Sequence, residues 1–276
     1  MNPPFGSTTD HLERGAILLR AGQFREALNE YESILRAEPE NAAAHLGVAR
    51  SHYGFVISVN EKLNEYKFVE ITDKPQYPVI DIDGDMNDAP LGTLVSISPG
   101  DMQRLHQAMR CATEEYENVL RINPVNSDAL AELGDIMVSK NPEKGFALLN
   151  QALQANSDNA LANWIIGEDH LNKGHIAEAF RHLARAIRTE PDNHKYWFSF
   201  ARFCAKNGMN DQAIDGYFHV IALRPSHRDA LFNLGTEFFE KKDPDMARKF
   251  WEQFLAIEPG SADAMYIHRI FPDLKK

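Results

Sequence analysis

The feature that most constrains this chain is a set of small, aromatic and proline residues that returns every 34 positions. The clearest copy occupies residues 160–193. Its small and helix-ending residues are Gly167, Gly174, Ala179, Ala186 and Pro191. Around them, apolar residues at helical spacing form two runs of about a dozen residues, separated by a turn at residues 172–174. The pattern predicts two antiparallel helices that approach closely at the small residues, the second ending at the proline.

The same marks recur further along the chain. Adding 34 to each position gives Ala201, Gly208, Ala213, Val220 and Pro225, and adding 34 again gives Gly235, Lys242, Ala247, Phe254 and Pro259. Helix pairs repeated at this period predict a solenoid, in which each pair packs on its neighbours.

These marks together resemble the tetratricopeptide repeat. The residues that carry the resemblance are Trp197, Phe200, Ala201, Cys204, Ala213, Tyr217 and Pro225, followed by Leu231, Leu234, Gly235, Ala247, Trp251 and Pro259. The resemblance implies an all-α fold, a right-handed superhelical solenoid of antiparallel helix pairs. It also implies a protein-interaction scaffold that binds a peptide segment or a partner protein in a concave groove.

The period divides the chain into six repeats with short ends. We expect a loose lead-in at residues 1–7, repeats at 8–41, 42–126, 127–159, 160–193, 194–227 and 228–260, and a capping helix and tail at 261–276.

The second of these repeats is interrupted. Pro39 and Pro124 lie 85 positions apart, 51 more than one period, which predicts an insertion at about 54–100 before a second helix at about 103–121. Apolar runs between Pro and Gly predict short strands at 67–72, 77–82 and 93–98. A helix start is predicted at residues 98–101, with Ser as the cap, Pro in the first turn and then an acid. We expect the insertion to be structurally separable, and either to cover the groove or to extend the outer edge of its repeat.

The composition excludes several classes of function. Of the 276 residues, 43% are hydrophobic and 25% charged, as in soluble proteins, and the formal charge of −11 argues against a phosphate-backbone binder. No apolar run is long enough to span a membrane, and residues 1–10 lack the pattern of a signal peptide. Cys111 and Cys204 fall in apolar helical surroundings, which favours a reducing compartment. We therefore expect a cytoplasmic protein without nucleic-acid binding or membrane insertion.

The candidate binding residues lie on one face of the first helix of each pair. The second, fifth, ninth and twelfth places share that face, away from the partner helix. In the family this face lines the groove. It carries Leu46, Arg50, Tyr53, Asp128, Asp135, Trp164, Glu168, Lys195, Phe198, Arg202, Phe232 and Phe239. The aromatic column of Trp164, Phe198 and Phe232 either anchors a partner or packs between neighbouring helices.

Other motifs point away from catalysis and metal binding. Lys195 and Asn233 are only isolated matches to the family's clamp for a C-terminal carboxylate, so we do not expect a chaperone-tail receptor. Asp81, Asp83 and Asp85 are spaced like calcium ligands, but Gly84 stands at the fourth place where that site needs glycine at the sixth, which favours a solvated turn. No catalytic constellation, phosphate loop or dinucleotide fingerprint occurs, so we expect neither an enzyme nor a cofactor. Two alternatives stay open: a targeting module of a larger enzyme, and an adaptor whose insertion responds to a ligand or calcium.

Overall fold

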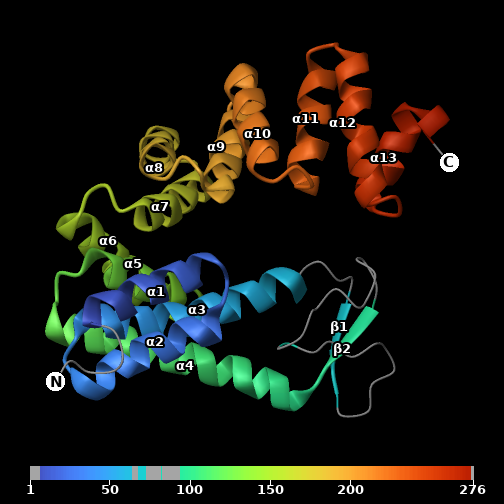
Figure 1. Ribbon diagram of the computed structural model, residues 1–276. Coiled ribbons are helices and arrows are strands. Elements are labelled where there is room, and N and C mark those ends of the chain that lie inside the picture. Colours follow the sequence, from blue (N-terminus) through green and yellow to red (C-terminus); the bar gives the residue numbers. More distant parts are fainter. Residues whose placement is uncertain (1–6, 64–67, 73–81, 83–93, 275–276) are drawn as a thin grey trace. The chain divides into compact units, whose positions relative to one another are not determined.

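The computed structural model describes residues 7–63, 68–72, 82 and 94–274, which contain thirteen α-helices and one two-stranded sheet (Figure 1). The described helices pack mainly as consecutive pairs joined by short turns. The chain divides into two compact units, Met1–Ala155 and Asn156–Lys276. The predicted all-α fold of helix pairs with a small β-containing insertion is confirmed. The boundaries between repeats stay a prediction.

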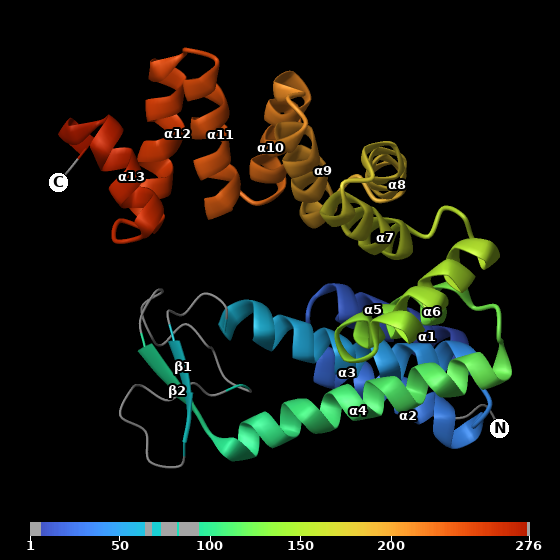
Figure 2. The same ribbon diagram turned by 180° about the vertical axis from the view of Figure 1, so that it is seen from behind.

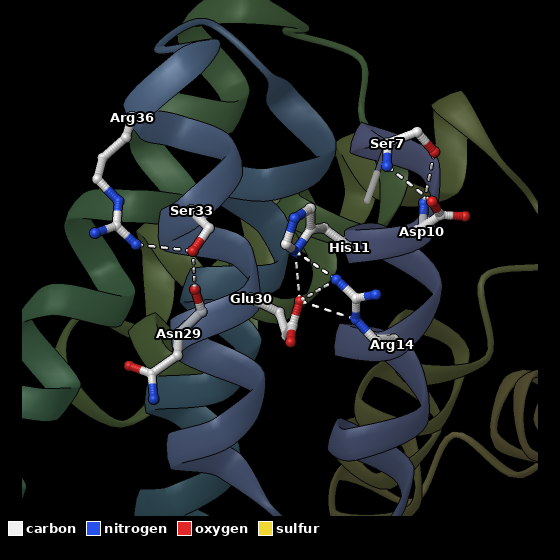
Figure 3. Close-up of polar contacts among 8 residues, drawn as sticks. All are labelled: Ser7, Asp10, His11, Arg14, Asn29, Glu30, Ser33 and Arg36. Atoms are coloured by element: carbon white, nitrogen blue, oxygen red, sulfur yellow. Dashed lines mark hydrogen bonds and ion pairs between the residues drawn. The ribbon is translucent and has the colours of Figure 1, made fainter. Parts of the chain in front are cut away.

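The first unit holds α1 (Thr8–Arg20), α2 (Phe24–Ala37), α3 (Ala42–Leu63), α4 (Pro99–Ile122), α5 (Ser127–Lys140) and α6 (Pro142–Ala155). The Ser7 hydroxyl accepts a hydrogen bond from the amide of Asp10, and the Asp10 carboxylate accepts one from the amide of Ser7 (Figure 3). These two reciprocal bonds form a capping box at the start of α1. Polar contacts then join α1 to α2, because Glu30 pairs with His11 and Arg14 (Figure 3).

Aromatic packing against glycine sets the spacing of the first three helices. The Tyr31 ring of α2 is 4% exposed and lies between Gly15 of α1 and Gly47 of α3. A Cβ at Gly15 would lie 2.5 Å from that ring and one at Gly47 would lie 2.4 Å from it, both closer than real Cβ contacts. Only glycine lets the two helices approach the ring on both sides.

The insertion differs from the prediction at both of its ends. The helix α3 does not end near Tyr53 but runs to Leu63, and α4 begins at Pro99 rather than near Gln103. Ser98 caps α4 as predicted, its hydroxyl accepting the Asp101 amide at 3.0 Å. The helices extend because Val56 and Val59 of α3 meet Leu105 and Ala108 of α4 in a small core of their own, which Ile82 and Ile97 complete.

Two of the three predicted strands are present. The strands β1 (Phe68–Ile71) and β2 (Leu94–Ile97) pair in parallel, with Phe68 opposite Leu94. Both lie past the far ends of α3 and α4 (Figures 1 and 2). The remaining predicted strand, at 77–82, lies outside the described residues except for Ile82.

The second unit holds α7 (Ala160–Lys173), α8 (Ile176–Thr189), α9 (His194–Lys206), α10 (Asn210–Leu223), α11 (Arg228–Glu240), α12 (Pro244–Ile257), α13 (Ala262–Ile270) and the 3-10 helix η2 (Pro272–Leu274). Its core is continuous from Leu171 to Ile267 and includes Trp251, which is fully buried. The predicted last helix is confirmed as α13, which Ser261 caps by accepting the Ala264 amide.

A buried carboxylate in this second core predicts a pH-dependent stability. Glu237 of α11 is 6% exposed, and its Oε2 has no hydrogen-bond partner within the described residues. Burial, with the charge of Glu240, raises the pKa of Glu237 above its ordinary value, although Asn210 opposes the shift. A raised folded-state pKa gives stability below about pH 4.5 that is lost as pH rises through the folded pKa.

We therefore expect Glu237→Gln to be more stable than the parent by about 1 kcal/mol at pH 7, because the amide carries no buried charge. At pH 4 the two proteins should unfold at the same urea concentration. Glu252→Gln, at an exposed position of α12 that does not act on the pKa of Glu237, serves as the control and should shift neither midpoint. A Glu237→Gln protein that is less stable at pH 7 would show that the charged carboxylate contributes favourably.

Candidate functional site

A pocket of about 550 Å³ opens in the first unit, on the side where α1 faces α3. We call it the α1–α3 hollow. Its lining residues are Leu12, Ala16, Leu19, Arg20, Phe24, Tyr31, Ala43, Leu46, Gly47 and Arg50. This volume suits a few side chains, and its wall is apolar except for the two arginines and the tyrosine.

The hollow brings together equivalent positions of α1 and α3, the first helices of two successive pairs. Leu12 and Ala16 of α1 precede Leu46 and Arg50 of α3 by one period of 34. Leu46 and Arg50 were predicted as binding residues, whereas Leu12, Ala16 and Leu19 were missed. Subtracting one period from the predicted residues would have found all three, because α1 presents the same face as α3.

Arg50 is the most strongly paired side chain of this site. Its Nε donates to both carboxylate oxygens of Glu132, at 2.9 and 3.0 Å, and its Nη2 donates to Asp128 at 2.8 Å. Burial by itself would lower the pKa of Arg50, but the two carboxylates outweigh it and raise that pKa. The Arg50 charge is thus already balanced by α5, and a partner would have to compete for it.

Tyr53 and Asp135 form a second link between α3 and α5. The Tyr53 hydroxyl donates to Asp135 Oδ2, and burial together with that carboxylate raises the pKa of Tyr53. Four of the predicted binding residues, Arg50, Tyr53, Asp128 and Asp135, therefore contact one another across two helices. These bonds hold α3 against α5, so the four side chains contribute to the structure of the first unit as well as to its polar surface.

The remaining polar groups of the hollow are Arg20 and the Tyr31 hydroxyl. Arg20 is exposed at the last residue of α1, and within the described part of the chain it forms no ion pair. The Tyr31 hydroxyl makes no hydrogen bond to any described residue. Burial raises the pKa of Tyr31, while the charges of Arg50 and Arg20 oppose that shift, so both cations act on the phenol.

The predicted aromatic column lies in the second unit and is partly used in packing. Trp164 Nε1 donates to Ser199 at 2.8 Å, and the indole lies 5.4 Å from the Tyr196 ring. The Phe198 ring lies 4.7 Å from His227, and the Phe232 ring lies 5.4 Å from Phe254. All three side chains are half-buried against the core, an arrangement that favours the packing alternative over an open ladder.

The other predicted residues of the second unit surround this column. Arg202 lies 3.7 Å from Glu168 and 5.9 Å from the Phe198 ring centre. Lys195 is half-buried near the start of the same helix, and Phe239 is 38% exposed at the end of α11. The charges of Arg202 and Glu168 beside the column are therefore paired with each other, and they do not form a clamp for a ligand's carboxylate.

Two further predictions concern calcium binding and membrane insertion. Asp81, Asp83 and Asp85 lie outside the described residues. Among the residues that the structure describes, no group of three His, Cys, Asp or Glu side chains is placed to hold a metal ion. None of the described helices combines the length and the apolar character that crossing a bilayer requires.

The helix pairs stack on one another, with glycine under a large side chain, and the first helices of two pairs form a hollow. These features define a repeat protein whose unit is a pair of antiparallel helices. The family model of the tetratricopeptide repeat matches residues 12–54 and 166–221. The tetratricopeptide repeats that the sequence predicts are thus confirmed in these two stretches.

Several known proteins are similar to parts of the chain. The putative cytochrome c-type biogenesis protein CcmH of Haemophilus influenzae is 30% identical over 110 residues, 39% of this chain and 24% of that protein. A TPR repeat-containing protein of Dictyostelium discoideum is 28% identical over 154 residues, 52% of this chain and 58% of that protein. The cell division cycle protein 16 homolog of Mus musculus is 23% identical over 154 residues, 55% of this chain and 24% of that protein. The chain thus spans between 24% and 58% of the length of these relatives.

Two solved structures have the same fold. That of Pseudomonas aeruginosa pilF has a TM-score of 0.64 at 15% identity, covering 95% of this chain and 96% of the other. That of the APC/C hetero-tetramer Cut9–Hcn1 has a TM-score of 0.63 at 16% identity, covering 95% of this chain and 42% of the other. At these identities the likeness establishes the fold alone.

Proposed function

We propose that this chain is a non-enzymatic protein-interaction scaffold that binds a segment of a partner protein along the inner face of its first helix pairs. The observation that carries the proposal is the α1–α3 hollow, in which Leu12 and Leu46 occupy one repeat position on the first helices of two successive pairs. An apolar side chain of a bound segment that fills the hollow would be shielded from water on several sides. Such desolvated anchors usually dominate the free energy of binding.

The predicted groove residues of the second unit are a weaker part of the proposal. Trp164, Phe198 and Phe232 contribute to packing, so a partner would contact only the outer part of each ring. We propose that Phe239, which is more exposed than these three rings, adds contact area at the end of α11.

The test uses a random 12-residue peptide library displayed on phage and the intact chain as bait. Ala16→Trp fills the hollow without changing the charge, and Ala21→Trp places the same ring at an exposed position just past α1. We expect peptides enriched on the parent to bind Ala16→Trp at least about tenfold more weakly and Ala21→Trp unchanged. Helicity and melting temperatures of both variants that equal those of the parent establish that the fold is kept. An absence of enriched peptides, or peptides that bind both variants equally, contradicts the proposal.

The cellular setting is also a proposal. We propose a cytoplasmic location because Cys111 and Cys204 are both free thiols, and the thiol of Cys204 is buried. The formal charge of −11 supports protein rather than nucleic-acid partners. A targeting module of a larger enzyme stays a prediction from the sequence. An adaptor whose insertion responds to a ligand or calcium stays one too, since Asp81, Asp83 and Asp85 lie outside the described residues.

A further inference from the structure

We propose that the α1–α3 hollow selects partner segments in which an Asp or Glu side chain stands next to an apolar side chain, Arg20 and the Tyr31 hydroxyl holding the carboxylate. The inference rests on the proposed function and adds the chemistry of the bound segment. It follows from which polar groups of the hollow are already paired and which are not.

The lining of the hollow is cationic at one edge and apolar elsewhere. No Asp or Glu lines it, and its two charged residues are both arginines. The chain as a whole carries a formal charge of −11, so an acidic segment would be repelled over most of the surface. A local cation beside an apolar wall gives such a segment one favourable place to bind.

The two arginines differ in what they can offer. Arg50 gives its Nε and Nη2 to Glu132 and Asp128, which together carry more negative charge than one guanidinium neutralises. Arg20 is exposed and forms no ion pair with a described residue. The charge left for a ligand is therefore that of Arg20, and a guanidinium binds a carboxylate through two parallel hydrogen bonds.

Tyr31 supplies a fixed donor beside this charge. Gly15 and Gly47 hold its ring on both sides, so the hydroxyl cannot turn away without moving a helix. A phenol is protonated at neutral pH and burial raises the pKa of Tyr31 further, so the hydroxyl is available to donate. The hydroxyl has no partner among the described residues, and a carboxylate oxygen of the ligand would satisfy it.

The apolar half of the recognition comes from Leu12, Leu19, Phe24 and Leu46, which are all half-buried. The hollow, at about 550 Å³, has room for an apolar side chain as well as a carboxylate. Arg20 is exposed at the rim, where a bound segment can continue past it, so a side-chain carboxylate within that segment can reach the guanidinium.

The experiment repeats the phage selection with library peptides that have no free C-terminus, on the parent, Arg20→Glu, Arg25→Glu and Tyr31→Phe. Arg25 is exposed on α2 and does not line the hollow, so it controls for the charge change. Peptides enriched on the parent and on Arg25→Glu should carry Asp or Glu within two positions of Leu, Ile, Met or Phe. Arg20→Glu should bind them at least about tenfold more weakly, and Tyr31→Phe about threefold more weakly.

A second measurement ties the acid to Arg20. Replacing the acidic residue of an enriched synthetic peptide, amidated at its C-terminus, by its amide should weaken binding to the parent about tenfold. The same replacement should strengthen binding to Arg20→Glu, because it removes the repulsion between two carboxylates. Enriched peptides that are sensitive to Ala16→Trp but show no acidic preference would overturn this inference and leave the proposed function standing. Peptides insensitive to Ala16→Trp, or no enrichment at all, would overturn the proposed function and this inference with it.

Discussion

Replacing Trp251 with Ala is expected to lower the free energy of unfolding by about 3–5 kcal/mol. The side chain is fully buried and lies over Gly235, where a Cβ would approach the indole to 2.3 Å. Its ring contacts Phe239, at 5.6 Å between ring centres, and Phe271, at 5.8 Å, so one side chain joins α11, α12 and the end of α13. The neighbouring helices can close only part of the space left by alanine, because each is held by other contacts.

Urea denaturation followed by circular dichroism measures this loss. Phe218→Ala is the matched control, since that ring is 37% exposed and should cost only about 1 kcal/mol. The indole Nε1 also donates to the Phe232 carbonyl at 3.1 Å, so Trp251→Phe should fall between the parent and the alanine variant. A Trp251→Ala cost below that of Phe218→Ala would mean that the end of the second unit repacks around the missing ring.

The second large effect is expected at Gly47, where substitution by Leu should destabilise the first unit by about 3 kcal/mol. Even the Cβ would lie 2.4 Å from two carbons of the Tyr31 ring. That ring cannot retreat, because Gly15 of α1 lies against its other side. The strain must therefore be relieved by moving α3 away from α2.

Two controls separate this clash from a general cost of changing glycine. Gly260→Leu adds the same side chain where nothing lies within 4 Å of the new Cβ, and it should change the urea midpoint little. Adding Tyr31→Ala to Gly47→Leu should recover part of the loss, since it makes room for the leucine. Equal midpoints for Gly47→Leu and Gly260→Leu would show that α3 can shift without cost.

The packing marks could be predicted from the sequence because they depend on spacing alone. Gly235 and Trp251 stand at fixed places in their repeat, and the structure brings them into contact. The same holds for Gly167 and Leu183, where a Cβ would lie 2.9 Å from the leucine side chain. A small residue under a large one is a local rule, and a regular period repeats it.

The end of α3 could not be predicted from the period, because the period ends that helix near Tyr53. The insertion was predicted to begin at about Gly54, yet Phe24 of α2 lies against this glycine, where a Cβ would be 2.4 Å from the ring. Glycine is there for close packing and not for a turn. The apolar residues Val56 and Val59 indicate that the helix continues. That indication can be recognised only once Leu105 of α4 is known to pack against them.

The candidate site was predicted in part for a similar reason. The face that carries Leu46 and Arg50 follows from helical geometry, and both residues line the hollow. The pairing of Arg50 with Glu132, 82 positions later, does not follow, because Glu132 stands outside the places assigned to the groove. Which charged side chains are paired depends on contacts that spacing along one helix does not contain.

The long second helix pair has a consequence for how this chain tolerates change in length. At about 1.5 Å per residue, the 22 residues of α3 reach about 33 Å, whereas the 14 residues of α5 reach about 21 Å. Ala44 and Val48 pack toward α2, and Ala49 packs toward α4 and α5, all in the first part of α3. The last turns of α3 pack mainly in the small core that Leu105 and Ala108 of α4 and Ile97 of β2 share with them. Deletions or additions beyond those turns would leave the stacking angle between repeats unaltered, so the insertion is a place where the chain can vary in size while its neighbours keep their register.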